Sequence, residues 1–150
     1  MPDDTILSVR KAGQQYAYTA LHLHETIARL AGFSGTDHKY LGFFLQRGSL
    51  TAGEFATLTG LTTGAVTGLI DRFEKKKLLK RQLDKQDRRK VIIVPDTKKI
   101  RALFEPYYKD FQKATDALIS AFPEQERTVI QSFLLQSIEL MKATTARLNS

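Results

Sequence analysis

Apolar residues recur every three to four positions over most of this chain, which is the spacing of amphipathic helices. Residues 5–31 keep this spacing and predict a first long helix, followed by Gly32 as a stop signal. A second helix is expected after Thr36, which we interpret as its N-cap, and Gly48 is expected to end it. The pattern therefore predicts a chain that begins with two helices.

Two short helices with a tight connection follow. Thr51 and Glu54 have the spacing of a capping box, and Gly60 is expected to end the first of these helices. Thr62 is the expected N-cap of the second helix. Its inward stripe consists of apolar residues at helical spacing: Val66, Leu69, Ile70 and Phe73. Two short helices joined in this way are typical of a helix-turn-helix.

After Lys77 the hydrophobic period changes from that of a helix to that of a strand. Leu79, Arg81 and Leu83 alternate with Lys80, Gln82 and Asp84, and the sequence "RKVIIV" supplies a return strand, so we expect a β-hairpin with a polar tip. Asp96 or Thr97 is then expected to cap a long helix that reaches about Ala121. Pro123 suits the first turn of a last helix, whose apolar stripe is Ile130, Phe133, Leu134, Ile138 and Met141.

A helix-turn-helix followed directly by a hairpin is a winged helix. We therefore predict a mainly α chain in which residues 34–97 form a winged helix-turn-helix lobe with an α/β wing hairpin. Residues 1–33 and 98–150 are expected to form a helical dimerisation region within the single chain of residues 1–150. The terminal helices carry more apolar surface than a small winged domain can cover, which favours a symmetric homodimer; the alternative is an intramolecular bundle in a monomer.

The positive charge of the chain is concentrated in its middle third. The net charge is +7, and residues 62–101 hold thirteen Lys and Arg against five Asp and Glu, a balance of +8, whereas the rest of the chain has a balance of −1. A concentrated basic patch is the electrostatic footprint of a partner with many negative charges. Nucleic acid is favoured over a membrane surface, because the basic residues do not lie on one long amphipathic helix.

Composition argues against several other classes of protein. The chain has 150 residues and no cysteine, which excludes a disulfide framework and a thiolate metal site. It has no secretory segment and no apolar run of membrane-spanning length, so we expect a cytoplasmic protein. His22 and His24 are two positions apart and point to roughly opposite faces of a helix. We expect no catalytic site, no metal and no cofactor.

Three motifs in order resemble the MarR family of transcription regulators. They are Leu50-Thr51-x-x-Glu54-Phe55-Ala56, Val66-Thr67-x-x-Ile70-Asp71-Arg72-Phe73-Glu74 and Asp87-x-Arg89, and they lie within residues 50–94. The resemblance implies a homodimeric, double-stranded DNA-binding regulator, more often a repressor, which acts on a palindromic operator. Lys77 departs from the family pattern, which commonly has a glycine there, and Gly68 stands where a base-reading side chain is common.

The candidate DNA-binding residues lie on the helix-turn-helix and on the wing. They are Thr51, Thr62, Thr63, Gly64, Thr67, Gly68, Arg72, Lys85, Asp87, Arg88, Arg89 and Lys90. Threonines can bond to phosphates or base edges, and exposed glycines in a helix suggest close approach of a partner. A carboxylate can aim an arginine at a minor groove, which is the role we expect of Asp87 toward Arg89. The alternative for the wing is a solvated hairpin with a weak ion pair.

The resemblance also implies a small effector, often aromatic or anionic, bound between the dimerisation and DNA-binding parts. Candidate lining residues are Tyr16, His22, His38 and Tyr40. Two other functions stay open at this point: a structural module that binds nucleic acid without sequence preference, and an interaction module that uses the winged domain on an acidic protein.

Overall fold

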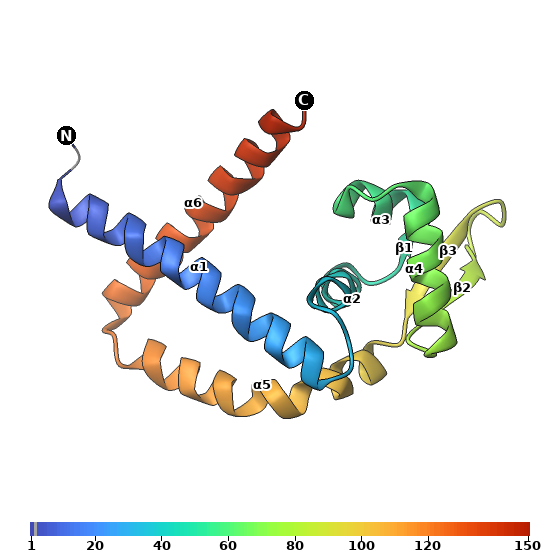
Figure 1. The fold of residues 1–150 in the computed structure, drawn as a ribbon, viewed down its shortest axis with the longest axis horizontal. Coiled ribbons are helices and arrows are strands. Elements are labelled where there is room, and N and C mark those ends of the chain that lie inside the picture. Colours follow the sequence, from blue (N-terminus) through green and yellow to red (C-terminus); the bar gives the residue numbers. More distant parts are fainter. Residues whose placement is uncertain (2) are drawn as a thin grey trace. The chain divides into compact units, whose positions relative to one another are not determined.

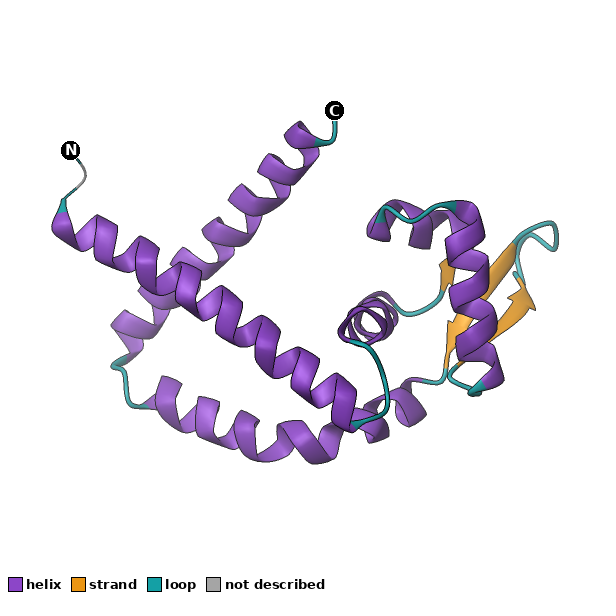
Figure 2. Ribbon diagram, viewed as in Figure 1, coloured by secondary structure: helices purple, strands orange, loops and turns teal. Residues whose placement is uncertain are grey.

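The computed structural model describes residue 1 and residues 3–150, and its elements are shown in Figures 1 and 2. The helices are α1 (Asp4–Leu30), α2 (Gly35–Arg47), α3 (Ala52–Thr59), α4 (Thr63–Lys75), α5 (Thr97–Ser120) and α6 (Glu124–Leu148). The strands are β1 (Leu50–Thr51), β2 (Leu79–Leu83) and β3 (Val91–Pro95). The mainly helical winged helix-turn-helix predicted from the sequence is confirmed.

Most of the predicted helix ends are confirmed by their capping bonds. Thr51 accepts a hydrogen bond from the Glu54 amide at 3.1 Å, and the Glu54 carboxylate accepts one from the Thr51 amide at 2.8 Å. This capping box lies at the start of α3. The helix ends at Gly60, whose backbone has the left-handed conformation. Thr62 caps α4 by accepting a hydrogen bond from the Ala65 amide.

Two predicted caps were wrong by one or two residues. The N-cap of α2 is Ser34, whose hydroxyl accepts a hydrogen bond from the Asp37 amide at 3.0 Å, and Thr36 already lies inside the helix. Ser34 is extended, as an N-cap must be, and its side chain reaches the third amide of the helix. Pro123 likewise occupies the N-cap position of α6 and not its first turn.

The wing contains a third strand that the sequence pattern did not indicate. The strand order is β1-β3-β2 and both pairings are antiparallel, with Leu79 opposite Pro95 at one end of the hairpin and Leu83 opposite Val91 at the other. The two-residue strand β1 pairs Leu50 with Ile93. This pairing ties the start of the helix-turn-helix to the wing.

The chain divides into two compact units, residues 1–107 and 108–150. The buried apolar core lies in the first unit and includes the stripe of α4, Val66, Leu69, Ile70 and Phe73. In the second unit, α6 has no buried residue in the single chain. Over the residues described, no helix combines the length and the hydrophobicity needed to cross a membrane.

Candidate nucleic-acid interface

The outward face of α4 is polar and accessible. The buried stripe faces the core, while the candidates on the other side, Thr62, Thr63, Gly64, Thr67, Gly68 and Arg72, are exposed. Thr51 at the start of α3 is half-buried. The local reason is the spacing of the apolar residues, which allows only one side of α4 to be buried.

The threonines of this face differ in what their hydroxyl groups already bond. Thr51 and Thr62 accept amide hydrogen bonds as N-caps, so each keeps a hydroxyl proton that can be donated to a phosphate oxygen. Thr67 donates its proton to the Thr63 carbonyl at 3.0 Å and keeps its lone pairs as acceptors. The N-caps are thus suited to phosphates, and Thr67 to a donor on a base edge.

Nothing within the described chain fills the space above the two glycines of α4. A Cβ atom added to Gly64 or Gly68 would meet no atom within 4 Å. Internal packing therefore does not require glycine at either position, although glycine weakens a helix by about 1 kcal/mol relative to alanine. Close approach by an external partner is the explanation that this geometry supports.

Arg72 has an internal partner that the sequence did not reveal. Its Nη2 atom lies 2.6 Å from Oδ1 of Asp37 on α2, and its guanidinium also lies over the Phe73 ring at 5.6 Å. The Arg72 side chain remains 52% exposed, whereas that of Asp37 is 14% exposed. Arg72 is therefore held in one direction and can still reach a phosphate.

Two aspartates shape the tip of the wing. The Asp84 carboxylate accepts a hydrogen bond from the Gln86 amide at 2.8 Å, and the Asp84 amide donates to the Lys90 carbonyl. The Lys90 amide in turn donates to the Asp87 carbonyl, which closes a tight turn. Lys85, Arg88 and Lys90 are exposed around this turn.

Asp87 and Arg89 form the pair expected at this tip. Asp87 Oδ1 accepts hydrogen bonds from the Arg89 amide and from Arg89 Nε, both at 3.1 Å, and Oδ2 accepts one from Nη2 at 3.4 Å. Hydrogen bonds from the side chain and then the amide of Arg89 lower the pKa of Asp87. The Arg89 side chain is 90% exposed, so a directed cation projects from the wing.

A second arginine joins the wing to α4, which is the second helix of the helix-turn-helix and is called the recognition helix from here on. Arg81 Nη2 lies 2.6 Å from Asp71 Oδ1, and Nη1 lies 3.4 Å from Glu74 Oε1. The Arg81 amide also donates to Glu74 Oε2 at 3.1 Å. Sequence reasoning missed this residue, although alternation on β2 places Arg81 on one face together with Leu79 and Leu83.

The candidate effector residues are not gathered into one cluster. The His38 ring stacks on His24 at 5.6 Å and meets Phe104 edge-on at 4.6 Å, whereas the Tyr40 ring packs against Phe55. Burial and then the charge of His24 lower the pKa of His38. His24 was missed, although it lies one turn before the buried Ile27 and Ala28 on the same face of α1.

The other two candidates on α1 lie outside this group of rings. Tyr16 is 71% exposed, and His22 is exposed. Tyr16 precedes His24 by eight residues, or about 12 Å along a helix. The four predicted residues therefore do not line one described pocket by themselves.

A three-stranded wing beside a polar, exposed recognition helix defines a winged helix-turn-helix DNA-binding protein. Residues 31–90 match the sequence profile of the MarR family. The uncharacterized HTH-type transcriptional regulator YcgE of Bacillus subtilis is 38% identical over 128 residues, which are 83% of this chain and 80% of that protein. The chain belongs to the MarR family of HTH-type transcriptional regulators, which are not enzymes.

Solved structures of other proteins share the fold. A MarR family protein from Bacillus stearothermophilus superposes with a TM-score of 0.73 at 22% identity, covering 95% of this chain and 99% of that one. Streptococcus pneumoniae FabT, solved in complex with DNA, gives a TM-score of 0.70 at 19% identity, covering 93% of this chain and 99% of that one. The similarity extends over both compact units.

Proposed function

We propose that this regulator is a homodimeric repressor that recognises a palindromic operator and responds to a small effector. The main support for DNA binding is Arg89, which Asp87 directs and which projects from the wing. The exposed face of α4, with open space above Gly64 and Gly68, is the second element of the same surface. In this proposal the start of α4 enters the major groove, where Thr63, Thr67 and the two glycines approach the bases. Arg89 enters the adjacent minor groove, and its neighbouring cations contact phosphates.

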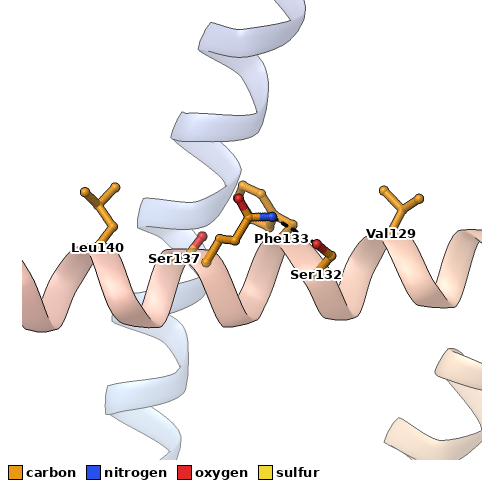
Figure 3. A pocket seen from close by; sticks show the side chains of 6 residues that line it. Val129, Ser132, Phe133, Ser137 and Leu140 are labelled. Carbon is orange, nitrogen blue, oxygen red and sulfur yellow. Dashed lines mark hydrogen bonds between the residues drawn. The ribbon is translucent and has the colours of Figure 1, made fainter.

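The homodimer is supported by the apolar face of α6. Side chains such as Val129, Phe133 and Leu140 project from this helix around a shallow pocket (Figure 3) and are 69%, 52% and 69% exposed. A contiguous apolar surface of this kind marks an interaction site. A second copy is the occupant we propose, because two copies related by a two-fold axis present two recognition helices to the two halves of a palindrome.

An effector is proposed from the family resemblance, with Tyr16, His22, His38 and Tyr40 as candidate contacts. Its binding would shift the population between a DNA-competent and an incompetent dimer. Of the four, His38 is the one in a ring cluster between α1, α2 and α5, with His24 and Phe104. A transcription regulator must have access to DNA, so we propose a cytoplasmic location for this protein.

Selection of bound fragments from genomic DNA by the purified protein tests the function. We expect a palindromic consensus, and an affinity for it that exceeds the affinity for random DNA by at least about a thousandfold. The logarithm of the affinity should fall linearly and steeply with the logarithm of salt concentration. Equal affinity for consensus and random DNA would favour a structural module, and weak salt dependence would favour a protein-interaction module.

Sedimentation analysis of Phe133→Asp tests the dimer. We expect this variant to be monomeric and to lose operator binding, because a charge on the apolar face of α6 opposes burial. Gln131→Glu, an exposed change on the same helix, is the matched control and should remain dimeric. If Phe133→Asp remained dimeric, this face of α6 would not be the dimer interface.

A panel of phenolic and carboxylic compounds, assayed for release of operator DNA, tests whether the protein responds to a small effector.

A further inference from the structure

Lys77 holds a backbone conformation that favours glycine. Its φ angle is +57°, and within the described part of the chain it is the only residue other than glycine with a positive φ. The Lys77 amide donates to the Glu74 carbonyl and the Leu78 amide donates to the Phe73 carbonyl, the two bonds of a Schellman motif that ends α4. The strain comes from the lysine Cβ atom, which crowds the backbone in this conformation.

Three other helices are followed by glycine at a positive φ. Gly32, Gly48 and Gly60 follow α1, α2 and α3, and each has a positive φ. A glycine at position 77 would satisfy the same backbone requirement without strain. The lysine side chain is therefore the feature that distinguishes this helix end.

Lys77 lines a pocket of about 540 Å³ where the end of α4, the base of the wing and the start of α5 meet. Two more lysines line the same pocket, Lys80 on β2 and Lys98 on α5. These three side chains form no ion pair with any described residue. Three lysines from adjoining segments therefore line one pocket, together with two carboxylates, those of Glu74 and Asp96.

Both carboxylates of the pocket have partners within the chain, and that of Glu74 is paired with a cation. Glu74 pairs with Arg81 and accepts the Arg81 amide, and Asp96 accepts a hydrogen bond from the Lys99 amide at 3.0 Å. Neighbouring cations are held elsewhere: the Lys99 ammonium donates to the Lys76 carbonyl at 3.0 Å, and that of Lys76 lies 4.2 Å from the centre of the Phe33 ring. Lys77, Lys80 and Lys98 are left for an external anion.

The pocket lies away from the proposed DNA contacts. Lys77 follows the recognition helix at its C-terminal end, about 20 Å from Thr63 at 1.5 Å per residue. Lys80 lies at the base of the hairpin, about 12 Å or more from its tip at about 3.3 Å per residue, and Lys98 lies on α5, beyond the end of β3. Recognition helices read bases with their N-terminal residues, so these lysines are not needed for that task.

We propose that this pocket is a binding site for a small ligand that carries a diphosphate group. Lysines act as point charges toward phosphate oxygens, and three of them can neutralise most of the charge of a diphosphate. No arginine is among the described residues that line the pocket, and the neighbouring Arg81 is committed to Asp71 and Glu74, so the bidentate pairing that suits a carboxylate is not offered. A pocket of this volume falls within the usual range for small ligands.

Titration calorimetry of the full-length protein with inorganic pyrophosphate at low salt tests the site. We expect one pyrophosphate per chain, and binding weakened at least about tenfold in Lys77→Gly, since one charged hydrogen bond is lost. This variant retains the fold, because glycine suits the backbone at position 77. Lys75→Gln, an exposed change on the last turn of α4 outside the pocket lining, is the control and should bind as the wild type does.

Three results with pyrophosphate would overturn the proposal. They are no pyrophosphate binding by the wild type, unchanged binding in Lys77→Gly, and an equal loss in Lys75→Gln, which would indicate a general basic surface. Phosphate groups of DNA are the other source of this chemistry, so Lys77→Gly is also titrated with operator DNA. An unchanged DNA affinity supports a separate small-ligand site, whereas a parallel loss would assign these lysines to the DNA contact.

Discussion

Arg72 on the recognition helix and Asp37 on α2 are joined by a 2.6 Å ion pair across 35 positions of sequence. The bond ties the exposed face of α4 to the helix that also carries His38. Asp37 is the more enclosed partner, whereas half of the Arg72 side chain is accessible. The pair therefore acts as an anchor that sets the direction of a cation on the exposed face of α4.

A double-mutant cycle should measure this anchor. Asp37→Asn, Arg72→Gln and the double variant are compared by the free energy of unfolding, and we expect a coupling energy of about 0.5–1 kcal/mol, typical of a partly exposed pair. The cycle removes the separate effect of Asp37 on the first turn of α2. Strictly additive changes would mean that the ion pair contributes nothing to stability.

Loss of the Arg89 guanidinium should weaken operator binding. Arg89→Ala is expected to reduce the binding free energy by about 1–3 kcal/mol, because a directed minor-groove contact is lost. Asp87→Asn should have a smaller effect in the same direction, since Arg89 remains but is no longer braced. The matched control is Arg88→Ala, which should flatten the salt dependence by about one unit of slope and leave the selected consensus unchanged. If Arg89→Ala weakened binding only as much as Arg88→Ala, and Asp87→Asn strengthened it, the wing tip would supply only charge.

Adding a methyl group to the recognition face should separate stability from DNA binding. Gly68→Ala is expected to raise the free energy of unfolding by about 1 kcal/mol, because alanine favours the helix and its Cβ meets open space. The same change should lower DNA affinity if the groove wall approaches the backbone. Gly42→Ala on α2 also meets open space and is the control, with a stability gain and unchanged DNA binding. Unaltered DNA affinity in Gly68→Ala would contradict the close approach.

Protonation of His38 should destabilise the fold. Its pKa is lowered from the usual 6.5 by burial and by His24, so the unfolded chain takes up this proton at a higher pH than the native one. Above pH 6.5 the ring is neutral in both states, and as the pH falls below that value the free energy of unfolding decreases. His38→Gln should lose this part of the pH dependence, as measured by urea unfolding at a series of pH values. Parallel curves for the two proteins would show that His38 makes no contribution.

The helices, the wing and the brace at its tip were predictable because their signals are local. The capping box joins Thr51 to Glu54 three residues later, and Asp87 meets Arg89 two residues away. The buried stripe of α4 follows from the periodicity of its apolar residues. For the same reason, the exposed glycines and threonines of the opposite face were identified from the sequence.

Other contacts depended on how distant segments meet. The pairing of Leu50 with Ile93, the bond from Arg72 to Asp37 and the stacking of His24 on His38 join residues from separate elements, and short-range patterns do not encode such distances. The sequence by itself therefore determined which helices and strands form and which of their faces are apolar, since those follow from neighbouring residues. The tertiary structure alone decided which charges are paired and which remain open. Lys77, Lys80 and Lys98 line one pocket only because the end of α4, β2 and the start of α5 are packed together in the folded chain.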